Sequence, residues 1–220
     1  MKITVCMTKD EAVHQVVASI LLDLYKNISH FGFAALCLPG GSTAIPVLKH
    51  LAECPFPWEK VLIFLTDERL VPKGDERSNE FNLKRYFLNN IQPILSYIEA
   101  PRNQDELGEI KADFSQIFIE KKVPVSILIG MGEDGHVASL FTQKDTDNEG
   151  IYCFTSAPNG IDRVSLTLDF MSSASNISLL FFGPEKFKQF QLSVDSSVVT
   201  PLAKLLKRCG NNISVTYCMN

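Results

Sequence analysis

The sequence of 220 residues predicts an α/β fold in which a doubly wound, mostly parallel sheet carries helices on both faces. Three short, nearly continuous apolar runs support this prediction: Phe33–Leu38, Val61–Leu65 and Val125–Ile129. Runs without polar alternation are typical of strands covered on both faces. Each run leads into a turn rich in Gly, Asp or Pro and then into a helical pattern, and this alternation favours a parallel sheet. We therefore expect a Rossmann-like arrangement in a single domain over residues 1–220.

The first expected element is a strand over residues 2–6, and a helix is expected to follow it. Thr8 and Glu11 have the spacing of a capping box, in which the hydroxyl accepts from a free helix amide and the glutamate reaches back. Apolar residues then recur at helical spacing and form one core-facing stripe: Val13, Val17, Ile20, Leu21, Leu24 and Ile28. A second helix is expected over Ala44–Leu51, after the first apolar run.

Later elements follow from the same patterns. Further strands are expected at Ile151–Phe154, Arg163–Leu168, Ile177–Phe182 and Ile213–Cys218. Helices are expected near residues 78–88, 105–121, 184–193 and 199–208. The polar stretch Gln143–Gly150 is expected to be a surface loop. In open sheets of this kind ligands bind outside the carboxyl ends of the strands, so the loops after the three apolar runs are the informative ones.

The composition limits which binding partners and which cellular compartment we expect for the protein. A net charge of −4 and a pI near 5.6 argue against a nucleic-acid or anionic-membrane surface, which usually needs a clustered basic excess. The six cysteines have no C-x-x-C spacing, and this favours a reducing cytoplasm. The apolar run before Lys9 is too short for a signal peptide. Residues 27–48 lack charge, but Pro39–Thr43 interrupts them well before the ~20 apolar residues of a membrane span. Nothing in the sequence indicates an oligomeric state.

The loop after the first apolar run contains Gly40, Gly41, Ser42 and Thr43. Glycines let a backbone approach a ligand closely, and amides at a helix start carry partial positive charge, so the loop could cradle a phosphate. The alternative is a tight turn in which Ser42 or Thr43 is an ordinary helix cap.

The loop after the second run, Thr66–Pro72, places Asp67, Glu68 and Arg69 at the end of a buried strand. Packing alone does not explain these charges there, and the planar guanidinium of Arg69 suits a phosphate or carboxylate. A structural ion pair between Arg69 and Asp67 or Glu68 is the alternative.

The loop after the third run, Gly130–His136, contains G-x-G-x-x-G after a strand, but the acidic residue that a dinucleotide site needs about 20 residues on is missing. His136 beside Asp134 is more informative, because imidazole can take a proton from water without a metal. A structural histidine is the alternative. Asp145–Ser156 begins like a calcium loop but lacks the final glutamate, and no nucleophile elbow or Walker loop is present. We therefore expect neither a metal nor a cofactor.

Three segments resemble the signature blocks of the 6-phosphogluconolactonases, in the same order: PGGST at residues 39–43, TDERLVPKGDERSN at 66–79 and GMGEDGHVASLF at 130–141. The likeness extends over nearly the whole chain through Pro57–Val61, Ala157–Pro158, Arg163–Leu168, Gly183–Lys186 and Pro201–Leu206. Ala44 and Thr142 depart from it, because many members have proline at both places. These departures concern loop shape and remove no reacting group.

The resemblance implies a sugar-phosphate hydrolase that converts 6-phospho-D-glucono-1,5-lactone to 6-phosphogluconate in the oxidative pentose phosphate pathway. It implies that His136 is the general base and that the substrate phosphate is held by the Gly40–Thr43 loop, Arg69, Arg163 and Lys186. Asp134 would orient the imidazole or bind a sugar hydroxyl, and Asp67 would bind a hydroxyl; the alternative for both is loop capping. For Lys186 the alternative is a solvated lysine at a helix start.

Two other functions stay open at this point. Glucosamine-6-phosphate deaminases resemble this chain, but they usually carry Tyr where Arg69 stands and a glutamate shortly after the histidine. The residues after His136 are Val137–Thr142, without a carboxylate, and this favours the lactonase. A non-catalytic sugar-phosphate sensor could keep the glycine loop and the arginines, but it would have little use for His136.

Overall fold

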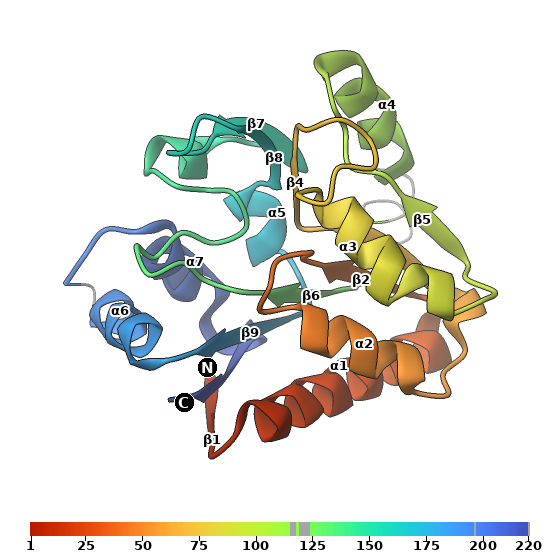
Figure 1. Cartoon of the computed structure of the whole chain (residues 1–220), viewed down its shortest axis with the longest axis horizontal. Helices are drawn as coiled ribbons and strands as arrows, with labels where there is room; N and C mark the ends of the chain where they lie inside the picture. The colour runs from red at the N-terminus through yellow and green to blue at the C-terminus, as the bar shows by residue number, and fades with distance from the viewer. Residues whose placement is uncertain (115–117, 119–123, 196, 220) are drawn as a thin grey trace.

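The computed structural model describes residues 1–114, 118, 124–195 and 197–219. Its main sheet has seven strands, all paired in parallel, in the order β1-β10-β9-β6-β2-β3-β5 (Figure 1). The strands are β1 (Lys2–Cys6), β2 (Ala34–Leu38), β3 (Val61–Leu65), β5 (Ser96–Ile98), β6 (Val125–Ile129), β9 (Asn176–Phe182) and β10 (Ile213–Cys218). The doubly wound, mostly parallel fold expected from the sequence is confirmed.

The three apolar runs form the buried centre of this sheet. Every residue of β2, β3 and β6 is buried, as expected for strands covered on both faces. The strand order reverses between β2 and β6, because β3 lies on one side of this pair and β9 on the other. The loops that leave the carboxyl ends of β2 and β6 therefore start side by side at the place where ligands bind in open sheets.

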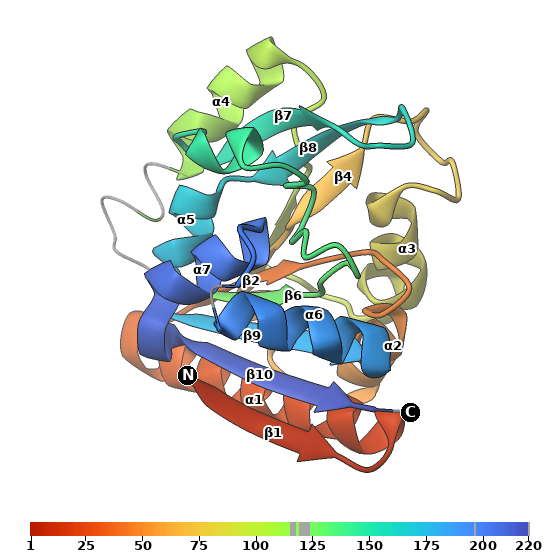
Figure 2. The ribbon, with the colours of Figure 1, turned by 90° about the vertical axis from the view of Figure 1, so that its left-hand side faces the viewer.

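A second sheet was not foreseen. Three antiparallel strands pair in the order β4 (Asp67–Arg69), β8 (Asp162–Leu166) and β7 (Tyr152–Ser156). The sequence located β7 and β8 to within two residues but implied no separate sheet, and it assigned Asp67–Arg69 to a loop. Three polar residues carry no strand periodicity, so only the pairing with β8 makes this segment a strand. Figure 2 shows the small sheet above the β9 and β10 region, on the side of α6 and α7.

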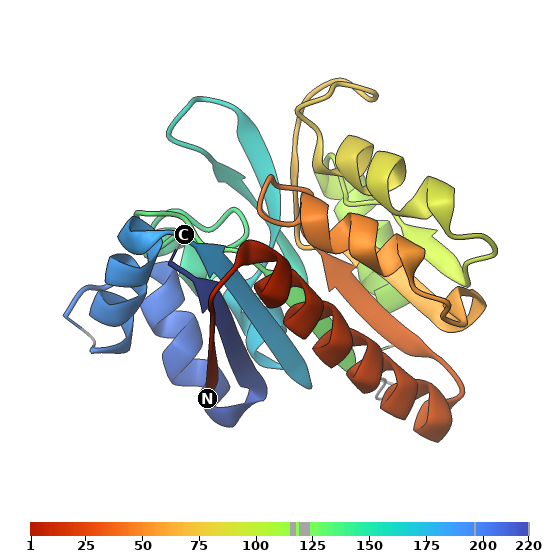
Figure 3. The ribbon, with the colours of Figure 1, turned by 60° about the horizontal axis from the view of Figure 1, so that its bottom comes forward.

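Helices cover both faces of the main sheet. The helices are α1 (Lys9–Phe31), α2 (Ile45–Glu53), α3 (Asn79–Tyr86), α4 (Gln104–Phe114), α5 (Leu168–Ser172), α6 (Pro184–Val194) and α7 (Pro201–Cys209). One face carries α1 and α2, while α6 and α7 lie on the other (Figures 2 and 3). The short α5 and β5 were not expected. The last part of the helix expected over 105–121 lies largely outside the described residues.

The capping box predicted for α1 is present. The Thr8 side chain accepts from the Glu11 amide at 3.1 Å, and the Glu11 carboxylate accepts from the Met7 amide at 2.8 Å. The helix ends at Gly32, whose φ of 83° is the left-handed conformation that glycine adopts without strain. Within the described residues, no helix has the length and apolar character needed to cross a membrane.

Candidate active site

Two cavities that share lining residues lie at the carboxyl ends of β2 and β6, and we call them the first and second lobes of the site. The first lobe is lined by Gly41, Ser42 and Thr43 from the loop after β2 and by His136 from the loop after β6. The second lobe adds side chains from the small sheet and its surroundings, namely Asp134, Ser139, Phe141, Ala157, Pro158, Asn159 and Arg163. Both lobes share Asp67, Arg69, His136 and Ala138. The glycine-rich loop and the histidine, 93 positions apart from Thr43 to His136, thus face one space.

In the loop after β2, Ser42 and Thr43 line the cavity and do not cap α2. The residue before α2 is Ala44, and no side chain caps the helix, so Ser42 and Thr43 are not the caps that the alternative interpretation required. Gly40 does not line the cavity. A Cβ atom there would lie 2.4 Å from the Asn79 backbone, and the Asn82 side chain donates to the Gly40 carbonyl at 3.0 Å. Gly40 therefore lets the loop pack against α3.

Two side chains of β4 face the cavity. The Asp67 carboxylate is buried and accepts from the hydroxyl of Thr66 at 2.9 Å and from that of Ser139 at 2.7 Å. Its partners are hydroxyls and not backbone amides, so it does not cap a loop. Arg69 donates through Nη1 to the Arg77 carbonyl. In the described part of the chain no ion pair joins Arg69 to Asp67 or Glu68.

A second arginine stands beside the first. Arg163 of β8 pairs directly with Arg69 of β4 in the antiparallel register, and only 7% of its surface is exposed. Burial lowers the pKa of Arg163, and the charge of Arg69 lowers it further. Neither guanidinium has an ion pair among the described residues. The charges of Asp67 and Glu68 partly offset this lowering of the pKa, and the two neighbouring guanidinium groups are of the kind that pairs with an anion.

The imidazole of His136 is hydrogen-bonded at one ring nitrogen and partly exposed to solvent. Its Nδ1 lies 2.7 Å from an oxygen of Asp134, and the same oxygen accepts from the His136 amide at 3.2 Å. The Phe141 ring lies 5.0 Å away, centre to centre. The side chain is 32% exposed, so the ring is not sealed in apolar packing. Asp134 therefore both caps the loop and contacts the ring at Nδ1, and the described residues place no hydrogen-bond partner at Nε2.

The negative charge of Asp134 suits its contact with Nδ1 of His136. Partial burial raises the pKa of Asp134, but the hydrogen bonds and the positive charge available from His136 outweigh that effect, so the pKa lies below its usual value. Gly132 makes the contact possible, because a Cβ there would lie 2.1 Å from Nδ1 of His136 and 2.4 Å from the Asp134 carboxylate. Only a residue without a side chain fits beneath the ring.

Several residues that organise the site were not singled out from the sequence. Ser139 links the histidine loop to β4 through its bond to Asp67, 72 positions away, and its amide donates to the Ser165 hydroxyl at 3.1 Å. Asn79 lines the first lobe, and its side chain donates to the Asp67 carbonyl at 2.8 Å. Glu68 bonds to α3, as described below. No local pattern distinguishes these residues, since their partners come from other elements.

Lys186 is half-buried in the first turn of α6 and lines neither lobe, so it does not lie with the other residues expected to bind phosphate. The stretch Gln143–Gly150 is mostly exposed, as expected of a surface loop. It is joined to α7, because Lys204 donates to the Thr146 hydroxyl at 2.6 Å and to Asp147 at 3.2 Å. In the described ranges no cluster of three or more His, Cys, Asp or Glu side chains could hold a metal ion.

The chain resembles proteins of one family. A family model described as glucosamine-6-phosphate isomerases/6-phosphogluconolactonase matches residues 7–213. A 6-phosphogluconolactonase of Caulobacter vibrioides is 31% identical over 94% of this chain and 93% of the relative. The human GDH/6PGL endoplasmic bifunctional protein is 29% identical over 80% of this chain, which spans only 24% of that longer protein. The crystal structure of the Thermotoga maritima 6-phosphogluconolactonase superposes over 100% of both chains, with a TM-score of 0.83 and 24% identity. Because the family model spans nearly all of the sequence and a relative above 30% identity is matched along almost its whole length, the chain belongs to the glucosamine-6-phosphate isomerase/6-phosphogluconolactonase family.

Proposed function

We propose that this protein hydrolyses 6-phospho-D-glucono-1,5-lactone to 6-phosphogluconate, because it is similar over most of its length to the 6-phosphogluconolactonases of Caulobacter vibrioides and Thermotoga maritima. The observation that supports the proposal best is the shared cavity: the open imidazole of His136 and the loop residues Gly41–Thr43 line the same lobe. A lactone carries its carbonyl at one end and its phosphate at the other. A cavity lined by both a base and anion-binding groups suits a substrate that carries both.

In the proposed reaction, Nε2 of His136 takes a proton from water as the water oxygen attacks the lactone carbonyl carbon. The bond between that carbon and the ring oxygen then breaks, and the imidazolium returns its proton to the ring oxygen. Asp134 holds Nδ1–H throughout, so that Nε2 is the basic nitrogen. General base catalysis of this kind typically contributes about 10²–10⁴-fold. The product is a carboxylic acid that ionises at neutral pH.

The phosphate is proposed to lie among the amides and hydroxyls of residues 41–43 and the guanidinium groups of Arg69 and Arg163. Binding of the phosphate holds the lactone carbonyl in place relative to His136, and this lowers the entropic cost of reaching the transition state. Lys186 is left out of this proposal, because it lines neither lobe. Asp67, held by two hydroxyls, is proposed to accept from a sugar hydroxyl. No step needs a metal or a cofactor.

The deaminase alternative is less well supported. The residues after His136 that line the cavity are Ala138, Ser139 and Phe141, and none of them carries a carboxylate. Among the described residues, those that follow His136 in its loop and line the cavity therefore supply no carboxylate for a proton shuttle.

The test is acid release at constant pH after fresh 6-phosphoglucono-lactone is added, measured against the spontaneous hydrolysis of the same solution. We expect release that scales with protein concentration. A rate that stays at the spontaneous value, or ammonia release from glucosamine 6-phosphate, would reject the proposal.

We also propose that residues 1–220 act as one domain, since both sheets contribute walls to the cavity. A cytoplasmic location is proposed on the ground that all six cysteines are free thiols, as a reducing compartment leaves them.

A further inference from the structure

Glu68 stands between two residues that line the cavity but does not line it itself. Successive side chains of a strand point to opposite sides, so Asp67 and Arg69 face the cavity while Glu68 faces α3. Its side chain is deeply buried, with 2% of the residue exposed. A buried carboxylate is costly unless donors satisfy it, so its partners indicate why it is there.

Four donors surround the two oxygens of Glu68. One oxygen accepts from the Arg69 amide at 2.6 Å and from the Asn79 amide at 2.7 Å. The other accepts from the Ser78 hydroxyl at 2.8 Å and from the Glu80 amide at 2.7 Å. Three of these groups belong to the first turn of α3, where unpaired amides and the helix dipole favour a negative charge. The carboxylate thus joins β4 to the start of α3.

The charge state of Glu68 follows from these partners. Burial raises the pKa of Glu68 above its usual value, and this effect outweighs the lowering by the amides of Glu80 and Asn79 and by the Ser78 hydroxyl. The three amides can only donate, so a protonated carboxyl group would need an acceptor that they do not provide. The arrangement therefore suits the ionised form, and a neutral amide in its place would turn an NH₂ group toward other donors.

The segment that Glu68 holds is also the one that orients Arg69. The Arg69 guanidinium donates to the carbonyl of Arg77, the residue directly before the helix cap Ser78. Arg69 is therefore connected to residues 77–80 in two ways. Its amide donates to Glu68, which also accepts from residues 78–80, and its guanidinium donates directly to the Arg77 carbonyl. If this turn shifted, the guanidinium would lose its fixed acceptor.

We propose that Glu68 is a positioning residue for anion binding: by clamping residues 78–80 to β4, it holds the Arg77 carbonyl where it aims the Arg69 guanidinium into the cavity. Glu68 itself does not touch the substrate. The inference rests on the proposed function for its substrate, but the positioning can be measured with inorganic phosphate alone.

The experiment compares Glu68→Gln, Arg69→Ala and the double variant with the unmodified protein. In Glu68→Gln we expect KM for the lactone and Kd for inorganic phosphate to rise roughly ten-fold, with kcat within about three-fold, because a ground-state contact is lost. In the Arg69→Ala background the same substitution should change KM and Kd by no more than about two-fold, since the group it positions is gone. Asp23→Asn is the matched control, because Asp23 also joins a helix to a strand, through Ser126, away from the cavity.

Equal effects of Glu68→Gln with and without Arg69 would overturn the inference and leave a purely structural role. So would unchanged KM and Kd in a folded Glu68→Gln variant. If that variant does not fold, Ser78→Ala serves instead, because it removes one of the four donors and keeps the charge of Glu68. We then expect a smaller rise in KM that disappears in the Arg69→Ala background. A rise in KM that persists in that background would overturn the inference. An unmodified protein that hydrolyses no lactone would reject the proposed function instead, and phosphate Kd values would still decide the role of Glu68.

Discussion

Arg69 of β4 and Arg163 of β8 stand directly opposite each other in an antiparallel pair. Like charges in that position destabilise a sheet, and burial of Arg163 adds to the cost. The described residues supply no carboxylate at ion-pair distance from either side chain. If the proposed phosphate binds here, it relieves the part of this repulsion that the more distant carboxylates of Asp67 and Glu68 do not offset.

Arg69→Ala should raise KM for the lactone by about 10–100-fold and change kcat little. A hydrogen bond to a charged group contributes about 1.5–3 kcal/mol, and the phosphate is held equally in the ground and transition states. Steady-state kinetics measures both constants. Arg85→Ala, an exposed arginine of α3 that packs against the Tyr86 ring, is the control and should leave KM unchanged. A fall in kcat with constant KM would contradict phosphate binding by Arg69.

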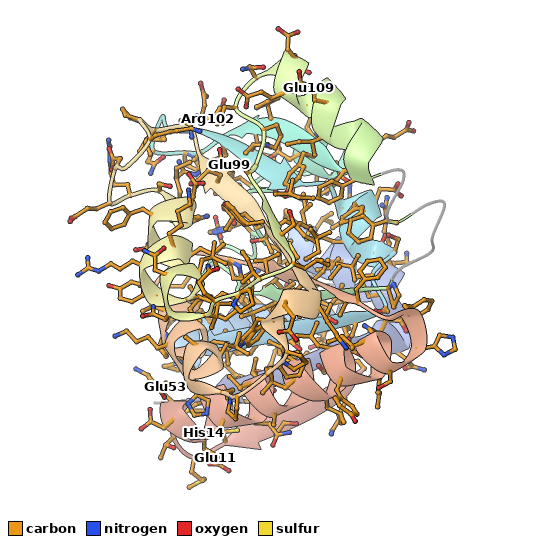
Figure 4. The ribbon with its side chains drawn as sticks, turned by 90° about the vertical axis from the view of Figure 1, so that its right-hand side faces the viewer. Glu11, His14, Glu53, Glu99, Arg102 and Glu109 are labelled. Carbon is orange, nitrogen blue, oxygen red and sulfur yellow. The ribbon has the colours of Figure 1, made fainter. Side chains whose placement is uncertain are left out.

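His136→Ala should lower kcat by about 10²–10⁴-fold while the Kd for inorganic phosphate stays within a few-fold. The imidazole is proposed to act on water at the carbonyl end, away from the anion. Turnover by acid release and calorimetry with phosphate separate the two effects. His14→Ala is the control, since His14 lies on α1, at the opposite end of the molecule from the small sheet (Figure 4). Equal losses of turnover and phosphate binding would point to a binding or folding role for His136.

Gly132→Ala should abolish most of the activity while phosphate binding persists. Its Cβ would lie 2.1–2.4 Å from the His136 ring and the Asp134 carboxylate, so the ring has to move away from its partner. Gly108→Ala is the matched control, because a Cβ at this site in α4 meets nothing within 4 Å. It should stabilise the fold by up to about 1 kcal/mol, the usual helical advantage of alanine over glycine. If Gly132→Ala turned over substrate at the wild-type rate, the contact between His136 and Asp134 would not be needed for activity.

Asp134→Asn should change how stability depends on pH. The pKa of Asp134 is lowered in the folded protein, so its contribution to the free energy of unfolding is present above the ordinary carboxyl pKa of about 3.9 and is lost as the pH falls through the lower folded value. The difference in Tm between the unmodified protein and the variant should therefore be largest above about pH 4 and shrink below it. Thermal unfolding from pH 3 to pH 7, followed by circular dichroism, measures this. A Tm difference that is the same at every pH would refute the linkage.

Much of the candidate site could be predicted because its residues follow buried strands. The apolar runs located β2, β3 and β6, and the residues after their carboxyl ends include Ser42, Thr43, Arg69 and His136, which share the cavity. The same approach predicted that Gly40 binds the ligand, and the structure adds a different reason for this glycine, its close packing against α3. Local sequence shows that a glycine is needed but not which neighbour requires it.

Patterns of neighbouring side chains were enough to predict the main buried strands, the starts of the long helices and the loops that carry charge, because each of these depends on residues close together in the chain. The fold had to be known before Arg163 could be placed opposite Arg69, Ser139 beside Asp67, and Glu68 against α3. These contacts join segments far apart in the sequence. Their formation depends on strand pairing and on the satisfaction of buried charge, which no local pattern of residues records.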